Sequence, residues 1–169
     1  MDNDRVGHSN RVPDYRFLTT WLLACPRRCA WDALAECESW PQWWRGVEEV
    51  TELRPGDERR VGSAYRVTWR APAIPYRVRF DFCVGQVEEP ALMAGTARGA
   101  LQGAGTWRLF EQDGVCAVTF DWQVSIERAW LNRLARVADP LLTRGHDRLM
   151  RRGGEDLARR MGVRLLAAG

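Results

Sequence analysis

The feature of this sequence that most restricts its fold is a period of two in hydrophobicity, which begins at Val47 and continues to Ile126. In its last stretch, every second residue from Cys116 onward is apolar and the residues between are small or polar. Side chains of a strand point alternately to the two faces of a sheet, so this pattern predicts strands with one buried and one solvated face. The same alternation occurs in 61–71 and 75–88. This part of the chain is therefore predicted to form a mainly antiparallel sheet.

The breaks in this alternation carry turn residues. Arg54-Pro55-Gly56-Asp57 predicts a turn, and Asp113-Gly114 predicts a tight hairpin. An aromatic and β-branched stretch at 15–24 predicts one further strand before the alternation begins. The sequence thus predicts a curved, seven-stranded antiparallel sheet, whose other strands are expected at 47–54, 61–71, 75–88, 91–98, 104–112 and 115–126.

Two short helices are predicted between the first strand and the rest of the sheet. The first begins with Pro26, whose missing N–H costs nothing in a first turn, and runs to about Cys37. The second covers the aromatic residues 39–44, with Ser39 as its N-cap.

A long helix is predicted from Ala129 to about Met161. The apolar face of the sheet needs a cover, and this helix, about 50 Å long at 1.5 Å per residue, is the segment long enough to provide it. The apolar stripe changes direction at Asp139-Pro140, so we expect a break near Pro140. Gly153-Gly154 predicts either close contact with the sheet or a second break, because glycine inside a helix costs about 1 kcal/mol relative to Ala.

Length and composition set limits on organisation and chemistry. The 169 residues predict one domain over 14–165, preceded by a loose polar tail at 1–13. All 25 basic residues are Arg, which excludes a lysine Schiff base. Five Cys without Cys-x-x-Cys spacing and only two His predict no metal site and no cofactor, and the polar N-terminal stretch predicts a cytoplasmic protein with free thiols.

Three segments carry a resemblance to a known group of proteins. They are the Pro26–Leu34 stretch with its Trp31, the aromatic run Trp40-Pro41-Gln42-Trp43-Trp44, and Gly103-Ala104-Gly105-Thr106-Trp107. Each resembles a motif of the START-like (SRPBCC) superfamily of polyketide cyclases and lipid-transfer proteins. The resemblance implies an α+β helix-grip fold, with the sheet wrapped on the long C-terminal helix and a cavity for a hydrophobic molecule between them. That superfamily includes carriers, receptors, cyclases and chaperone-associated domains, so the likeness by itself specifies no activity.

Candidate ligand-binding residues follow from the predicted inner faces. The inward aromatic side chains line such a cavity or simply fill it, and His146 on the helix is either a polar group facing a ligand or an ordinary core histidine. Arg98 is either at the cavity mouth, holding a carboxylate, or on the surface. The candidates are Tyr65, Trp69, Tyr76, Phe80, Arg98, Trp107, Trp122, His146, Met150 and Gly153.

The leading functional hypothesis is a non-enzymatic binding or carrier protein for a small lipid, polyketide or aromatic ligand. The alternative is a metal-free cyclase or dehydratase, with His146 transferring protons and Tyr65 or Arg98 orienting the substrate. A third hypothesis is a protein-interaction module that exposes the Trp40–Trp44 segment. The C-terminal arginines are interleaved with acids, which favours an ordinary solvated helix face. Transient contact with an acidic membrane is a lesser alternative, and no nucleic-acid site is expected.

Overall fold

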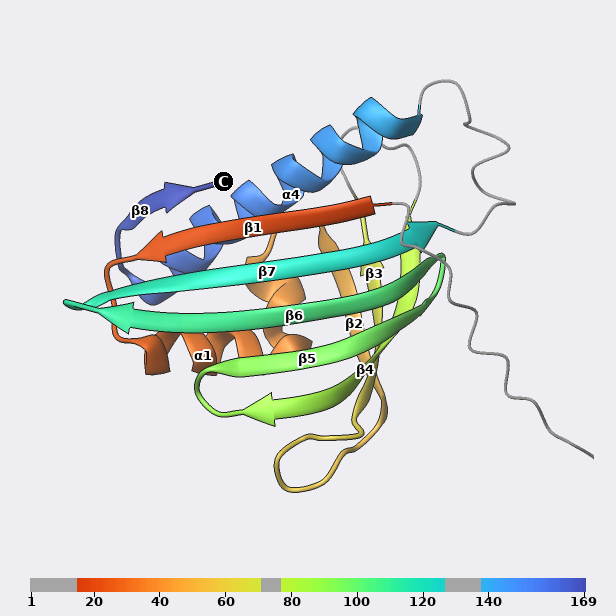
Figure 1. The fold of residues 1–169 in the computed structure, drawn as a ribbon, viewed down its shortest axis with the longest axis horizontal. Coiled ribbons are helices and arrows are strands. Elements are labelled where there is room, and N and C mark those ends of the chain that lie inside the picture. The colour runs from red at the N-terminus through yellow and green to blue at the C-terminus, as the bar shows by residue number, and fades with distance from the viewer. Residues whose placement is uncertain (1–14, 71–76, 127–137) are drawn as a thin grey trace, which may run out of the picture.

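The computed structural model describes residues 15–70, 77–126 and 138–169. In these parts of the chain, an antiparallel sheet of eight strands curves around two short helices and a long one (Figure 1). The predicted α+β helix-grip fold is confirmed, although the sheet has one strand more than predicted. The expected tail at 1–13 and the first part of the long helix, 129–137, lie outside the described residues.

The elements follow the predicted order. The described strands and helices are β1 (Tyr15–Leu23), α1 (Arg27–Ala35), the 3₁₀ helix η1 (Cys37–Ser39), α2 (Trp40–Trp43), β2 (Val47–Arg54), β3 (Ala64–Trp69), β4 (Val78–Glu88), β5 (Leu92–Gly99), β6 (Leu101–Gln112), β7 (Val115–Ile126), α4 (Ala138–Met161) and β8 (Leu165–Ala168).

The spatial order of the strands is β2-β3-β4-β5-β6-β7-β1-β8. Neighbouring strands from β2 to β7 are also neighbours in sequence, and β6 and β7 are joined by the predicted hairpin. Asp113 and Gly114 there have φ values of 51° and 75°, the two positive values that a type I′ turn requires.

The strand that the sequence did not predict is β8. It pairs with β1, so that Trp21 lies opposite Ala168, and the N–H of Gly169 donates to the carbonyl of Thr20 at 3.0 Å. Leu165-Leu166-Ala167-Ala168 shows no alternation of apolar and polar residues, so the pattern that predicts the other strands is absent from it. β1 is consequently an interior strand of the sheet.

The predicted division of the sheet into two faces is confirmed. On β7 the inward side chains of Cys116, Val118, Phe120, Trp122 and Val124 are at most 5% exposed. The outer face carries charged pairs, such as the one in which Arg66 of β3 donates to Asp81 of β4 at 2.8 Å. The inner face therefore forms the core, and the short helices and α4 cover it (Figure 1).

The glycine pair in α4 marks close contact with the sheet and α2, and the helix continues past it to Met161. A β-carbon at Gly154 would lie 2.8 Å from Cδ1 of Trp21, and one at Gly153 would lie even closer to Trp44. Pro140 is the third residue of the described part of α4. The residues needed to test a break before it lie outside the described part of the chain.

Two details of the short helices differ from the prediction. Pro26 is the N-cap of α1 and does not lie within its first turn. Ser39 occupies the N-cap of α2, but its hydroxyl donates to the carbonyl of Glu36 at 2.8 Å and makes no cap bond. The preceding 3₁₀ helix leaves Ser39 with helical dihedral angles, whereas a capping side chain needs an extended backbone.

Candidate ligand-binding recess

An apolar recess lies on the inner face of the sheet, between β3–β7 and the segment formed by η1 and α2. Ten of its residues come from the five strands, and two come from the short helices. The recess is lined by Cys37, Trp40, Tyr65, Val67, Trp69, Phe80, Phe82, Val84, Met93, Trp107, Phe120 and Trp122.

The recess is broad at its mouth and narrow inside. It holds about 510 Å³ of atom-free space when its solvent-open mouth is included, yet only about 40 Å³ admits the centre of a water-sized sphere. Cavities that enclose small ligands typically measure several hundred Å³. A ligand larger than a few waters therefore needs the aromatic side chains of the recess to move apart.

Five of the ten candidate residues lie together in this recess: Tyr65, Trp69, Phe80, Trp107 and Trp122. Tyr76 lies outside the described residues. Several lining residues were not selected from the sequence, although the same alternation identifies Val67, Val84 and Phe120 as inward. Cys37 and Trp40 carry no such signal, because they belong to short helices whose placement depends on tertiary packing.

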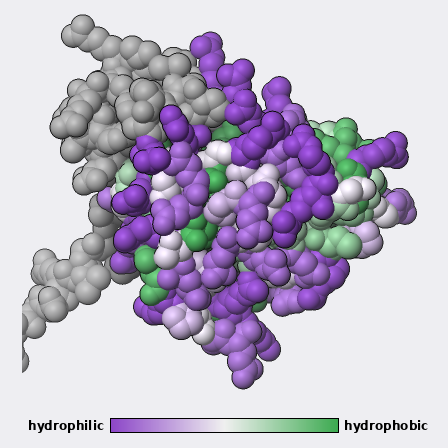
Figure 2. Space-filling view, turned by 180° about the vertical axis from the view of Figure 1, so that it is seen from behind, coloured by the Kyte–Doolittle hydropathy of each residue, from purple (hydrophilic) through white to green (hydrophobic). Residues whose placement is uncertain are grey.

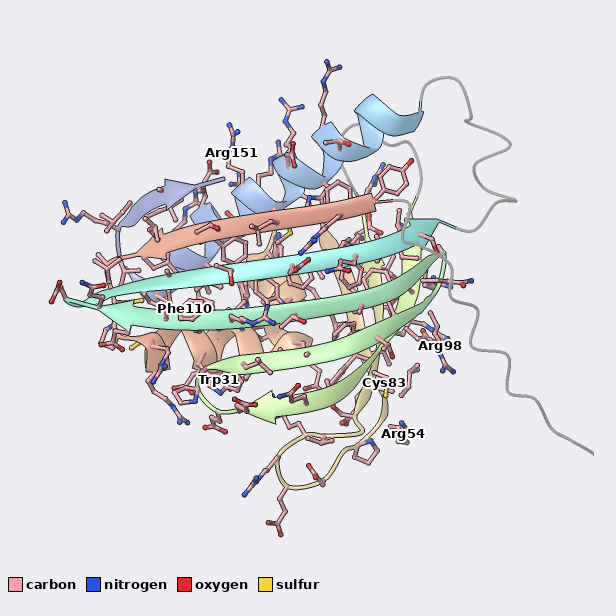
Figure 3. All side chains as sticks on the ribbon, in the orientation of Figure 1. Trp31, Arg54, Cys83, Arg98, Phe110 and Arg151 are labelled. Atoms are coloured by element: carbon pink, nitrogen blue, oxygen red, sulfur yellow. The ribbon has the colours of Figure 1, made fainter. Side chains whose placement is uncertain are left out.

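Arg98 does not reach the recess. It lies on the outer face of β5, exposed to solvent, opposite Asp81 of β4 in the strand register (Figure 3). Met93 and Ala97, at odd-numbered positions of β5, are buried on the inner face. Arg98, at an even-numbered position of the same strand, therefore points outward. The expectation that Arg98 stands at the cavity mouth is therefore wrong.

His146 is buried between α4 and β1 and does not line the recess. Its ring stacks on Phe17 with the ring centres 4.0 Å apart, and its side chain is 8% exposed. Among the described residues neither ring nitrogen has a hydrogen-bond partner, since the nearest carboxylate, Asp147, is 3.7 Å away from Nδ1. Burial lowers the pKa of His146 to about 4, more than the nearby Asp147 carboxylate raises it, so the imidazole is neutral at pH 7.

Met150 and Gly153 are also separate from the recess. Gly153 packs on the indole of Trp44, which in turn donates to the carbonyl of Leu149 at 3.1 Å. Met150 borders a second hollow between β1 and α4, whose inner free volume of about 200 Å³ compares with about 40 Å³ for the recess and whose walls include the charged Asp147 and Arg151. None of the described side chains of α4 lines the apolar recess, so the expected cavity between sheet and C-terminal helix lies instead between sheet and short helices.

The polar groups in the recess wall are uncharged at neutral pH. Desolvation raises the pKa of Cys37 to about 11 and also raises the pKa of Tyr65. A hydrogen bond with Ser63 opposes part of the rise at Tyr65, and a hydrogen bond between Tyr65 and Cys37 opposes part of the rise at Cys37. The recess therefore presents a phenol and a thiol, and neither an acid nor a base ready for proton transfer.

One donor in the recess wall is unused. The indole N–H of Trp69 is buried and has no hydrogen-bond partner among the described residues. The neighbouring indole of Trp40, by contrast, donates to the carbonyl of Leu34 at 3.1 Å. A buried donor without an acceptor costs about 1–3 kcal/mol, which makes Trp69 the most conspicuous polar feature of the recess.

Among the described residues, no three His, Cys, Asp or Glu side chains come close enough to share a metal ion. No described helix combines the length and the apolar character needed to cross a bilayer. Figure 2 shows the side opposite to that of Figure 1 as largely hydrophilic, with separate hydrophobic areas.

Comparison with solved structures supports the architecture. The chain is similar to a START superfamily protein from Mycobacterium smegmatis (12% identity, TM-score 0.70, covering 87% of this chain and 97% of that one). It is also similar to the Zhui aromatase/cyclase from a Streptomyces species (16% identity, TM-score 0.66, 88% and 93%) and to a conserved protein from Geobacillus kaustophilus (11% identity, TM-score 0.70, 88% and 95%). At these identities the likeness establishes the fold, which is that of START-like proteins. No match was found among curated proteins.

The family follows from the sequence itself. Residues 18–162 match the model of the family described as polyketide cyclase / dehydrase and lipid transport. The match covers most of the chain, which therefore belongs to this family. The resemblance inferred from the Trp40–Trp44 and Gly103–Trp107 segments is thereby confirmed.

Proposed function

We propose that this protein binds a small hydrophobic molecule in the apolar recess and acts as a binding or carrier protein. The observation that carries the proposal is the recess itself, a concavity with aromatic and aliphatic walls that opens to solvent. Apolar surface of this kind favours burial of an apolar ligand by about 25 cal/mol for each Å² removed from water. Membership of a family described by lipid transport supports the same proposal.

The arrangement favours binding over catalysis. The enzymatic alternative needs His146 beside the substrate, but His146 is held against Phe17 and outside the recess. Arg98, its proposed partner, faces the opposite side of the sheet. Tyr65, the other group considered for orienting a substrate, does line the recess, but His146, the group considered for proton transfer, does not.

The interaction-module hypothesis is not favoured either. It requires an exposed Trp40–Trp44 segment, whereas Trp40 and Trp44 are buried and Trp43 is half-buried. Trp43 stacks on Trp44 with ring centres 5.6 Å apart, and Trp44 contacts Trp21 edge-on. The segment belongs to the core and to the floor of the recess.

Native mass spectrometry of protein purified without detergent tests the proposal. We expect a bound small molecule that is lost on denaturation, or binding of the neutral apolar dye Nile red to protein that has been stripped. Val67→Phe should weaken binding, because it places a ring in the narrow part of the recess. Val115→Phe is the matched control, since Val115 lies at the start of β7 and does not line the recess. Absence of any bound molecule together with equal dye binding by both variants would contradict the proposal.

A further inference from the structure

We propose that the recess selects uncharged ligands that carry a hydrogen-bond acceptor, such as a carbonyl oxygen, and that the Trp69 indole N–H donates a hydrogen bond to this acceptor. The inference rests on the proposed function, because it assigns a ligand class to the same recess. It makes Trp69 a specificity-determining residue.

The wall of the recess carries no charged side chain. The twelve lining residues include no Arg, His, Asp or Glu, and the two groups that can ionise, Cys37 and Tyr65, stay protonated. Moving an ionised carboxylate into such a wall costs its hydration and returns no ion pair. The arginines of β3 and β5, including Arg66 and Arg98, project from the other face of the sheet. The recess therefore discriminates against fatty-acid anions and in favour of neutral molecules.

The indole N–H of Trp69 is the unused donor of the recess. The Trp69 ring meets Phe80 edge-on with ring centres 4.9 Å apart, and its centre lies 6.3 Å from that of Trp122, so aromatic neighbours surround it in the wall. Its N–H has no acceptor among the described residues, whereas Trp40 and Trp44 both donate to backbone carbonyls. An indole N–H can only donate. The group that completes this site must therefore supply an acceptor.

Tyr65 lies at the opposite end of the recess from Trp69. Tyr65 lies four residues before Trp69 on the same face of β3, which separates their backbones by about 13 Å. The Tyr65 hydroxyl is not among the buried, unpartnered polar atoms of the described residues, unlike the Trp69 N–H. Val67 lies between the two and offers apolar contact only. The requirement for an acceptor thus falls at the Trp69 end.

Two one-ring probes of nearly equal shape test the proposal: acetophenone, which has a carbonyl oxygen, and 2-phenylpropene, which has a methylene in its place. We would titrate each into ¹⁵N-labelled protein and follow the indole N–H resonances. We would compare the ratio of the dissociation constant of 2-phenylpropene to that of acetophenone. This ratio should be about tenfold larger in the natural protein than in Trp69→Phe. In the natural protein, acetophenone alone should move one indole proton resonance strongly downfield. That readout keeps the test valid even if Trp69→Phe folds poorly.

The matched control is Trp40→Phe. Trp40 lines the same recess, but its N–H already donates to Leu34, so this variant should leave the ratio of dissociation constants unchanged. Benzoate should bind at least tenfold more weakly than acetophenone. A ratio unaffected by Trp69→Phe, or benzoate binding as tight as that of the ketone, would overturn the inference alone. Failure of both neutral probes to bind would overturn the proposed function and this inference with it.

Discussion

Gly153 of α4 lies flat against the indole of Trp44, so closely that a β-carbon at position 153 would come 2.5 Å from Cε2 of the ring. The contact explains a residue that the helix itself disfavours. The same edge of the Trp44 ring is also held by a hydrogen bond, since its N–H donates to the carbonyl of Leu149 one turn earlier in the helix. Helix α4 is thus held to the aromatic core by two contacts with the indole of Trp44, one through Gly153 and one through Leu149.

Gly153→Ala is therefore expected to destabilise the protein. Alanine gains about 1 kcal/mol of helix propensity, but the clash with Trp44 costs more, because an indole packed on all sides has little room to shift. We expect a net loss of roughly 1–2 kcal/mol in urea denaturation. Gly85→Ala is the control, since a β-carbon there would meet only the Ala94 carbonyl at 3.9 Å. A more stable Gly153→Ala variant would show that the ring is free to move.

Asp156 should contribute strongly to stability. Its buried carboxylate accepts hydrogen bonds from the Arg45 backbone N–H at 3.0 Å, from Nε of the same arginine at 3.0 Å, and from Nη1 of Arg159 at 2.9 Å. Asp156→Asn is expected to cost about 2 kcal/mol in urea denaturation, because an amide accepts fewer of these bonds and without charge. The exposed Arg66–Asp81 pair is the control, and Asp81→Asn should cost less than about 1 kcal/mol. Equal losses in the two variants would refute the special role of Asp156.

The stability of the protein should fall in acid because of His146. Its pKa is about 4 in the folded state and near 6.5 when unfolded, so the unfolded chain binds a proton first as pH drops. The neutral imidazole's contribution is complete above pH 6.5 and should be reduced by roughly 3 kcal/mol at pH 4. His146→Leu should lose correspondingly less stability than the natural protein between pH 7 and pH 4. Parallel pH profiles for the two proteins would contradict this.

The same substitution should do little harm at pH 7. Both ring nitrogens of His146 lack partners among the described residues, so replacing the ring by an apolar side chain removes two unmet polar groups. We expect His146→Leu to be neutral or stabilising in urea denaturation at pH 7. A loss above about 2 kcal/mol would indicate that the stack on Phe17 matters more than the unpaired nitrogens.

The cysteines should differ sharply in reactivity. Burial raises the pKa of Cys37 to about 11 and that of Cys116 to about 12, and the thiolate is the reactive form. Cys29 is exposed on α1. With iodoacetamide at pH 7.5, we expect Cys29 to be alkylated in the native protein, and Cys37 and Cys116 only after unfolding. Peptide mass spectrometry gives the sites, and Cys29→Ser should remove the reaction at position 29 while leaving any reaction of the half-buried Cys83. Fast alkylation of Cys37 in that variant would show that the recess opens readily.

The architecture was predictable where a residue's environment follows from local periodicity. Alternation along β7 identified Val118, Phe120 and Trp122 as inward, and Asp113-Gly114 identified the hairpin, because both are properties of short stretches of chain. β8 was missed because its four residues carry no period, and its pairing with β1 depends on contacts between distant parts of the sequence.

The candidate site was predicted only in part, for a related reason. Strand parity placed Tyr65, Trp69 and Trp107 on the inner face, and the structure places all three in the recess. The helical stripe through His146 and Met150 also faces inward, but toward β1 and away from the recess. Which part of an apolar face a helix covers depends on its crossing position, and no residue pattern within the helix encodes that position.

The pairing of β8 with β1 also has a consequence for biosynthesis. β1 is the first described strand to leave the ribosome, yet one edge of its Trp21–Leu23 part is paired only by Leu165–Ala168, which follow α4. Until those residues emerge, the backbone donors and acceptors along that edge of β1 have no partner, and an open strand edge invites pairing with other chains. Contacts between such distant segments also slow folding, because a long loop must close first. Until Leu165–Ala168 emerge, β1 is therefore paired on one side only, with β7, and its other edge is open to contacts with other chains.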